Sequence, residues 1–311
     1  MAGWINYIVS MLTFAGLYAL MALGLNVIWG MAGMINLGLV GFFAVGGYVS
    51  ALLTLKLGLP IPLGVAAAVA LAAAAGALVA LTTAKLRGDY LAIVTLGFSE
   101  VVRLIAANEI WLTNGTDGIS RIPGPWRGQV PPEQFNLIFL AIVAAVVLAV
   151  VFLLQRVRHS PFGRVLRAIR DDDQVAAVAG KWVIFFKVEA FVVGAAVIGL
   201  SGALYGHYTS YISPDNYVPL ITIYIVLALS AGGTGNNWGA VVGSVLVVFF
   251  LESTRFLKDL LPFLKPVQVA AVREFLIASG LILVLHFRPQ GLIPERLPRS
   301  RLNDQADEKA P

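Results

Sequence analysis

The chain has 311 residues but no cysteine, three histidines and only 13% charged residues. The missing cysteines exclude disulfides, thiol nucleophiles and cysteine-ligated metals. No Walker-type glycine-rich loop, zinc-protease helix or nucleophile elbow is present, so the sequence predicts no catalytic site, no metal site and no cofactor. Soluble domains carry about 25% charged residues, so this chain has too few to cover a surface that faces water. It is therefore predicted to be a membrane-embedded protein and not an enzyme.

What the chain has in abundance is long hydrophobic runs. Hydrophobic residues make up 59% of it, and the mean hydropathy is +0.84. A membrane-crossing helix needs about 20 mostly apolar residues. The sequence predicts an all-α, polytopic transmembrane helical bundle with about nine spans, within a range of eight to ten. The candidate spans are 5–29, 33–57, 61–84, 90–111, 135–155, 188–212, 218–235, 237–256 and 268–287.

Two neighbouring pairs of these runs are separated only by short glycine-rich joints. One joint lies at 30–33 and the other around Gly235 and Asn236. Non-helical backbone at membrane depth is tolerated only where it is buried in protein or lines a cavity. Each joint is therefore either a turn between two full spans or part of a re-entrant hairpin.

The positions of the basic residues predict the orientation. They concentrate in the segment 156–187, in the short loop at 85–87 and in the tail from 288 onward. By the positive-inside rule these three regions belong in the cytoplasm, which places the N-terminus outside and the C-terminus inside. We expect one transmembrane domain, 1–293, with an outer loop at about 112–134. The polar tail 294–311 is expected to be disordered.

The segment 156–187 has the features of a projecting helical element. Ser160 and Pro161 mark a helix start, and Gly180 marks a helix stop. One interpretation is a coupling element that docks onto a motor subunit, because its apolar residues need a partner groove. The other is an interfacial helix with arginines near lipid phosphates. The candidate coupling residues are Arg164, Arg167, Arg170, Ala176, Ala177, Gly180, Trp182 and Phe185.

Small and polar residues inside the first, second and fourth spans form the second candidate site. Small residues allow helices to approach closely. Polar groups at membrane depth cost free energy, so they usually have a structural or functional role. These residues line a translocation path, or they serve helix packing alone. Glu100 and Arg103 have the spacing of an ion pair within one helix. The candidate path residues are Asn26, Gly30, Gly33, Asn36, Gly38, Gly41, Glu100 and Arg103.

Motifs in the right order along one chain resemble the LivM-type permease subunits of branched-chain amino acid ABC importers. The resemblance covers roughly residues 24–292. The motifs are GLNVIWG at 24–30 with NLG at 36–38, DYLAIVTLG at 89–97, TDGI at 116–119, SPFG at 160–163, GALY at 202–205, YISPD at 211–215 and RPQGL at 288–292. There are two departures. Leu39 stands where many relatives carry histidine, and Val175-Ala176-Ala177 lacks the glutamate of the usual Glu-Ala-Ala motif.

The resemblance implies an ABC importer permease in the bacterial inner membrane that handles small amino-acid-like solutes. Its implied partners are a homologous second permease, two ABC ATPase subunits, an extracytoplasmic solute-binding protein and membrane lipid, with no role for nucleic acid. The binding protein would dock at Thr116, Asp117 and Gly118. Two alternatives stay open. One is a urea or short-chain amide importer. The other is an ion-coupled secondary transporter, for which Glu100, His207 and Glu274 are the support.

Overall fold

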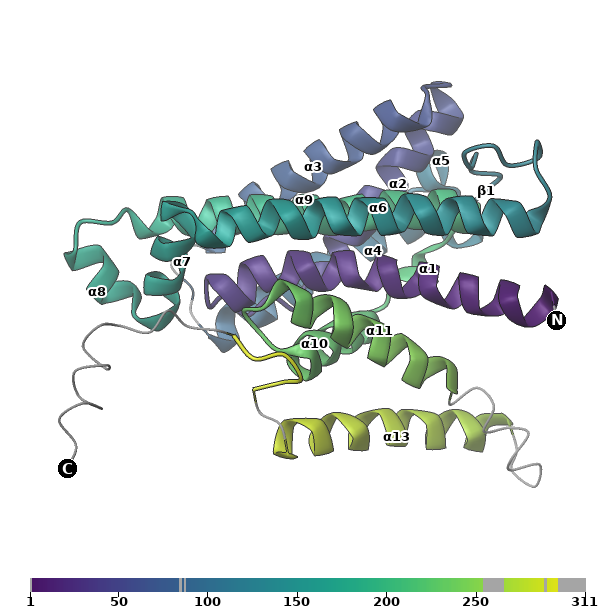
Figure 1. Ribbon diagram of the computed structural model, residues 1–311. Coiled ribbons are helices and arrows are strands. Elements are labelled where there is room, and N and C mark those ends of the chain that lie inside the picture. Colours follow the sequence, from purple (N-terminus) through teal and green to yellow (C-terminus); the bar gives the residue numbers. More distant parts are fainter. Residues whose placement is uncertain (1, 84–85, 87, 254–265, 288–289, 296–311) are drawn as a thin grey trace.

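The computed structural model describes residues 2–83, 86, 88–253, 266–287 and 290–295. Those residues form a long helical bundle whose first helix starts at one end and whose last described segment lies at the other (Figure 1). The longer helices are α1 (Ala2–Leu25), α2 (Leu39–Lys56), α3 (Ile61–Thr83), α4 (Asp89–Asn108), α6 (Pro132–His159), α9 (Val183–Thr209), α10 (Pro219–Gly232), α11 (Asn237–Ser253) and α13 (Pro266–Phe287).

Shorter elements sit at the two ends of the bundle. One end holds α7 (Pro161–Asp171) and α8 (Asp173–Val178), and we call it the α7–α8 end. The opposite end holds α5 (Ile110–Thr113), two 3-10 turns, η2 (Gly115–Asp117) and η3 (Pro214–Tyr217), and a two-residue pairing between β1 (Ile119–Ser120) and β2 (Tyr211–Ile212). We call it the β1–β2 end. A π-helix, η1 (Asn26–Met31), continues α1 directly.

The nine predicted runs match the nine long helices in order. Seven spans meet the length and apolarity that membrane crossing requires: the extended α1, α2, α3, α4, α6, α9 and the run Pro214–Gly232, which contains α10. Helix α11 is also apolar but has only 17 residues. The all-α, polytopic fold class is therefore confirmed. The boundaries differ most at the second run, because α2 begins at Leu39 and not at residue 33.

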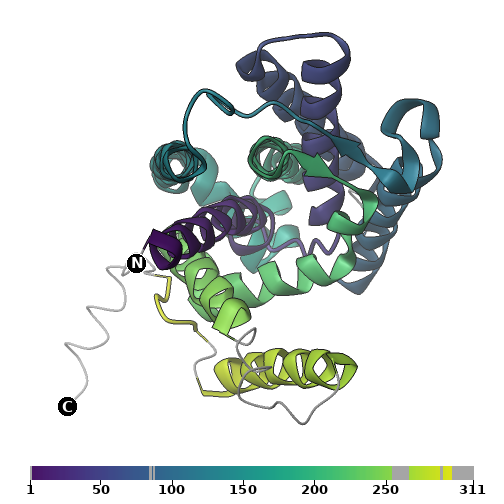
Figure 2. The same cartoon turned by 90° about the vertical axis from the view of Figure 1, so that its right-hand side faces the viewer.

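Helix α9 lies at the centre of the bundle, surrounded by α1, α2, α3 and α6 (Figure 2). Its most extensive packing is against α3 and α2, where small residues face each other. A side chain on Gly199 would press on Ala72, and one on Gly76 would press on Ala195. Small residues let transmembrane helices approach closely, since lipid supplies no hydrophobic drive between them. The alanine-rich sequence of α3 thus serves packing on α9.

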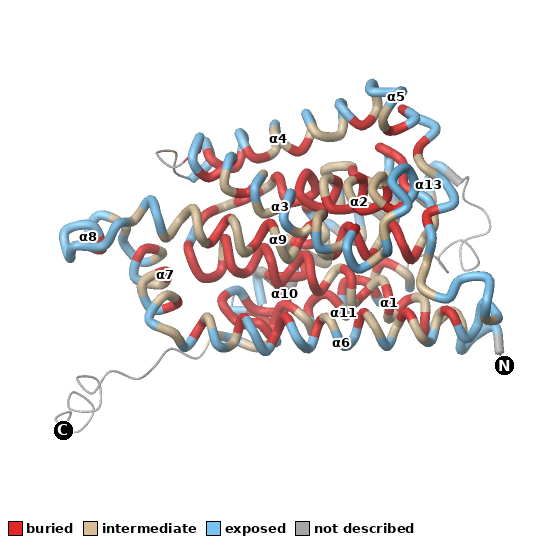
Figure 3. The backbone as a smooth tube through the Cα atoms, turned by 90° about the horizontal axis from the view of Figure 1, so that it is seen from above, coloured by how far each residue is buried: buried red, intermediate tan, exposed pale blue. Residues whose placement is uncertain are grey.

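Burial is uneven along the bundle. The buried residues of α1, α2 and α9 form its interior, while α8 projects beyond it and is almost wholly exposed (Figure 3). Helix α13 packs mainly on α10, at one side of the molecule (Figure 2). Exposed apolar side chains on α3, α4 and α6 are those expected to face lipid in a membrane protein.

Candidate functional site

The two glycine-rich joints predicted from the sequence meet in space. Asn26, the first residue of the π-helix, is fully buried. Its Nδ2 donates to Asn237 Oδ1 at 2.9 Å, and its Oδ1 accepts from the Gly235 N–H at 2.8 Å. A side chain on Gly30 would collide with Asn26 Oδ1 and with the backbone of Gly235. The joints therefore form one buried polar unit, which we call the joint cluster: Asn26, Gly30, Gly235 and Asn237.

The stretch between η1 and α2 is held by α4. Leu37 N–H donates to Thr95 Oγ1 at 3.1 Å, and Asn36 Oδ1 accepts from Gly38 N–H at 2.8 Å. A side chain on Gly38 would overlap the carbonyl of Thr95, and one on Gly41 would press on α4. Close packing therefore accounts for these two glycines. Among the described residues, Asn36 Nδ2 is buried without a hydrogen-bond partner, so a role for Asn36 in the path stays a prediction.

Glu100 and Arg103 form the ion pair that their spacing predicts. Arg103 Nε donates to Glu100 Oε2 at 3.0 Å, and both side chains are partly exposed on α4. The same helix exposes apolar side chains such as Ile93, Val101 and Leu104. The carboxylate is thus neutralised within its own helix, at the edge of an apolar surface. Participation of this pair in transport remains a prediction.

Helix α7 begins at the position that the sequence predicts. Ser160 caps it, because the Gly163 N–H donates to Ser160 Oγ at 3.3 Å. Its apolar residues Leu166 and Ile169 are buried against the bundle. The candidate coupling arginines do not share one environment, because Arg164 is exposed and Arg167 is half-buried.

Arg170 turns toward the bundle. Its guanidinium donates from Nη1 to the Gly30 carbonyl at 2.5 Å and to Glu295 Oε2 at 2.8 Å. The third predicted arginine therefore binds within the chain, and it connects α7 to the joint cluster. A direct contact between Arg170 and an ATPase stays a prediction.

Helix α8 is a short apolar tip. Asp172 caps it by accepting from the N–H groups of Gln174 and Val175 at 2.8 and 3.1 Å. Ala176 is buried, whereas Ala177 and Gly180 are exposed. Gly180 has a positive φ of 76°, which fits its predicted role as a helix stop. Beyond the cap the chain exposes Val178 by 91%, Trp182 by 73% and Phe185 by 47%.

A groove of about 580 Å³ runs between α7 and α8 and has Val165, Ala168, Ala176 and Ala179 among its lining residues. Such a surface on a projecting element is typical of a docking site for another protein.

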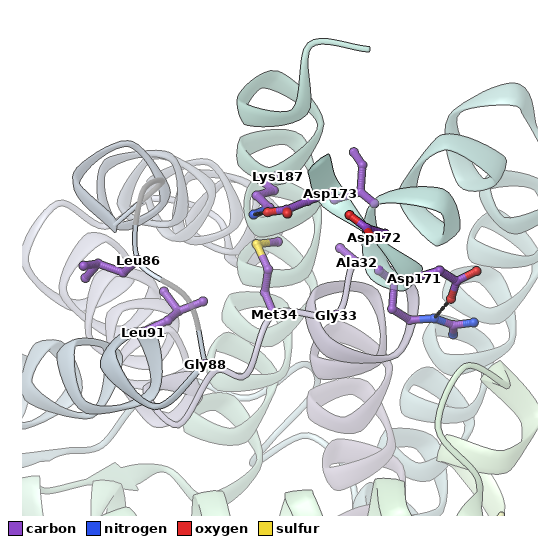
Figure 4. Close-up of a pocket in the computed structure, with 12 residues that line it drawn as sticks. Ala32, Gly33, Met34, Leu86, Gly88, Leu91, Asp171, Asp172, Asp173 and Lys187 are labelled. Carbon is purple, nitrogen blue, oxygen red and sulfur yellow. Dashed lines mark hydrogen bonds and ion pairs between the residues drawn. The ribbon is translucent and has the colours of Figure 1, made fainter. Parts of the chain in front are cut away.

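A second cavity, of about 310 Å³, lies at the root of this tip (Figure 4). It is bounded by Ala32, Gly33 and Met34, by Leu86 and the start of α4, and by 169–173 of the α7–α8 turn. Lys187 Nζ pairs with Asp173 Oδ2 at 3.0 Å on one side of it. Gly33, predicted in the path, thus borders the tip. The cavity places the joint between the first two predicted spans directly beside the α7–α8 turn.

At the β1–β2 end the three predicted docking residues form a fixed turn. Thr116 and Asp117 are exposed, and Gly118 is buried with a positive φ of 71°. The Gly118 carbonyl accepts from Asn114 Nδ2 at 3.0 Å, and the Asp117 carbonyl accepts from the Tyr211 hydroxyl at 3.1 Å. The turn is therefore pinned to the β1–β2 pairing and presents two polar side chains to the outside of the bundle. Contact with a binding protein stays a prediction.

The structure shows two arrangements that were not predicted from the sequence. His207, named above as support for an ion-coupled transporter, is buried, with Nδ1 2.6 Å from the Pro123 carbonyl and Nε2 2.8 Å from Ser50 Oγ. Glu295, expected in a disordered tail, packs beside α7; residues 296–311 of that tail lie outside the described residues. The side chain of Glu274, the third residue named in support of an ion-coupled transporter, also lies outside the described residues. In the described part of the chain no group of acidic and histidine residues could hold a metal ion.

Comparison with known proteins decides the family. Residues 7–285 match the family model described as a branched-chain amino acid transport system / permease component. The chain belongs to this permease family. It is 31% identical over 321 residues to the high-affinity branched-chain amino acid transport system permease protein LivM of Escherichia coli, covering 96% of this chain and 72% of the relative.

Two further relatives support membership of the branched-chain amino acid permease family. A probable LivM permease protein of Methanocaldococcus jannaschii is 30% identical over 94% of both chains. The LivH permease protein of Salmonella typhimurium is 25% identical over 76% of this chain and 80% of the relative. No solved structure matches. The family confirms a multi-pass membrane permease of the ABC importer type, and it confirms the prediction of a transport subunit over an enzyme.

Proposed function

We propose that this permease is the LivM-type half of an ATP-driven importer of branched-chain amino acids in the bacterial inner membrane. Its similarity to both LivM and LivH proteins supports pairing with a homologous second permease. Two ATPase subunits bind on one side, and a solute-binding protein delivers the amino acid on the other. The observation that carries the proposal is the exposed apolar tip of α8 with Trp182 and Phe185, at one end of a bundle that matches a permease family.

The arrangement of the two ends supports the predicted orientation. The α7–α8 segment, Leu86 and Glu295 lie at one end, and the start of α1 lies at the other with α5 and β1 (Figure 1). The segment 156–187 carries seven of the basic residues, so the positive-inside rule makes the α7–α8 end cytoplasmic. The N-terminus then lies outside, and nine helices cross in alternate directions. The turn at Thr116–Gly118 faces the binding protein.

In this assignment the permease is a passive conduit that another protein drives. Closure of the ATPase dimer moves the α7–α8 tip, and the bundle changes between two accessible states. Arg170 passes that movement on, because it joins α7 to the Gly30 carbonyl beside Asn26. The solute path follows the contact between α2 and α4, near Asn36 and Glu100.

The test is reconstitution of the complete set of subunits in proteoliposomes. We expect uptake of labelled leucine only when ATP, the ATPase subunits and the binding protein are all present. Collapse of the proton and sodium gradients should leave uptake unchanged while ATP is maintained. Uptake of labelled urea in preference to leucine would reassign the substrate. Uptake by this chain alone, driven by an ion gradient, would overturn the proposal.

A further inference from the structure

The segment after α13 returns to close the end of α10. Leu292 N–H donates to the Ala231 carbonyl and Ile293 N–H donates to the Gly232 carbonyl, both at 2.9 Å. The last carbonyls of a helix have no partner within it, so this segment supplies the missing donors for α10. Asn236 Nδ2 also donates to the Pro294 carbonyl at 3.2 Å. The next residue, Glu295, is therefore held in a defined place.

The Glu295 carboxylate lies between two arginines from different helices. Oε2 accepts from Arg170 Nη1 on α7 at 2.8 Å, and Oε1 lies 3.6 Å from Arg158 Nη2 near the end of α6. The exposed fractions of the three side chains are 14% for Glu295, 9% for Arg158 and 22% for Arg170. Charges this far from water need their partners, and removal of one leaves the others uncompensated. Here the loss of one carboxylate leaves two guanidiniums facing each other.

The second contact of Arg170 extends this arrangement to the helices. The same Nη1 donates to the Gly30 carbonyl at 2.5 Å, and Gly30 lies four residues after Asn26 in the π-helix. Asn26 in turn binds Gly235 and Asn237. A continuous chain of contacts thus runs from α7 through Arg170 and Gly30 to the joint between α10 and α11.

A cavity of about 610 Å³ borders this chain of contacts. Its lining includes Trp29, Gly33, Thr234 and Gln290 as well as Arg170 and Glu295. The space lies on the side of Arg170 where α7, η1 and the 290–295 segment meet. At the edge of this space Arg170 Nη1 stays bonded both to the Gly30 carbonyl of the π-helix and to Glu295.

We propose that Glu295 is a positioning residue for transport: it holds Arg170 so that a displacement of α7 is transmitted to the π-helix and the α10–α11 joint. This inference rests on the proposed function, in which an ATPase moves α7. Without the Glu295 carboxylate, the exposed α8 tip still binds the ATPase, and α7 still moves with it. Its movement then no longer reaches the helices, so ATP is hydrolysed with little import.

The experiment compares Glu295→Gln with Asp171→Asn in the reconstituted complex. Asp171 also lies near Arg170, 3.5 Å from its Nε, but it is 74% exposed, and exposed ion pairs contribute little. For Glu295→Gln we expect the number of ATP molecules hydrolysed per leucine imported to rise about tenfold, since a bond to a charged group is lost. For Asp171→Asn we expect a change of less than about twofold.

A structural readout separates coupling from simple loss of stability. Hydrogen exchange of the assembled complex should speed up in η1 and at the Leu292 and Ile293 amides in Glu295→Gln, with α8 unchanged. If Glu295→Gln does not assemble, Glu295→Asp replaces it, with the charge kept and one methylene removed, and a smaller rise in the same ratio is expected.

Two outcomes overturn the inference. One is an unchanged ratio of ATP to leucine in the Glu295 variant; the other is an equal rise in Asp171→Asn. Failure of the proposed function gives a different result, because the unsubstituted complex then imports no leucine with ATP, whatever residue stands at 295.

Discussion

The side chains at the two ends of the bundle differ in where they find their contacts. At the β1–β2 end the chain folds back on itself: His207 is bonded on both ring nitrogens, and Arg127 donates to the Tyr208 carbonyl and lies 4.2 Å from the centre of the Phe135 ring. At the α7–α8 end, the apolar residues of α7 are buried against the bundle, but Val178 and Trp182 at the α8 tip are exposed. Contacts within the chain thus hold the first end in place, although Trp111 is exposed there, whereas the α8 tip projects away from the second end.

Substitutions at the two ends should therefore affect different properties of the permease. A change at the β1–β2 end should lower the stability of the isolated permease, because the bonds it breaks are internal. A change at the α8 tip should leave that stability unaltered and weaken assembly. Substituting the same type of residue at each end tests both expectations.

The largest effect is expected for a pair of exposed tryptophans. Trp182→Asp at the tip should weaken binding of the ATPase by about thirtyfold or more, since buried aromatic anchors at interfaces contribute about 2 kcal/mol or more. Trp111→Asp at the opposite end replaces a side chain that is 76% exposed, close to the 73% of Trp182, and should leave ATPase binding unchanged. Co-purification of labelled ATPase measures both. Full retention in Trp182→Asp would contradict the docking assignment.

A pair of histidines provides the next test. His207→Ala removes bonds to Ser50 and to the Pro123 carbonyl and leaves a void, so the unfolding free energy should fall by about 2–4 kcal/mol. His159→Ala, at the exposed end of α6, should change it by less than about 0.5 kcal/mol. Thermal unfolding in detergent reports the difference. Equal melting temperatures for the two variants would show that the β1–β2 end is not held as described.

A pair of arginines should give a smaller effect. Arg127→Ala loses the backbone carbonyl contact and the ring contact with Phe135, at a cost of about 1–2 kcal/mol in unfolding free energy. Arg164→Ala is exposed on α7 and should change stability by less than about 0.5 kcal/mol. Denaturation of the isolated permease compares the two. A larger loss of stability in Arg164→Ala would reverse the contrast between the ends.

The smallest effect is expected at the cap of α8. Asp172→Ala removes the side chain that accepts from two backbone amides, and it should destabilise α8 by about 1 kcal/mol without affecting the bundle. Hydrogen exchange at Gln174–Val178 is the measurement, with Asp171→Ala as the control that caps no helix. Faster exchange throughout α6 and α9 in Asp172→Ala would mean that the tip is not an independent unit.

Much of the fold follows from local sequence patterns. Long apolar runs predict the helices, and Ser160 and Gly180 predict where the α7–α8 element starts and stops, because capping and left-handed backbone are local requirements. The start of α2 was placed too early. The six residues before Leu39 are apolar enough to read as helix, but they bend around Gly33 and bind Thr95 on α4.

The candidate site was harder to predict, because its contacts join distant parts of the chain. Arg170 has the same helical spacing as Arg164 and Arg167, yet it binds Glu295, 125 residues later. Asn26 meets Gly235 over a separation of 209 residues. Helical periodicity gives the face on which a side chain lies, but not which remote segment covers that face. The sequence therefore predicted the polar residues of the joints and could not pair them.

The return of the 290–295 segment to α10 also constrains how the protein is made. Helix α10 ends at Gly232, but the donors for its last carbonyls are the amides of Leu292 and Ile293. The ribosome must therefore add some sixty residues after the helix before its last carbonyls can receive these hydrogen bonds. The earlier helices can form as translation proceeds, whereas the contact between the 290–295 segment and α10 can form only after α13 has been synthesised.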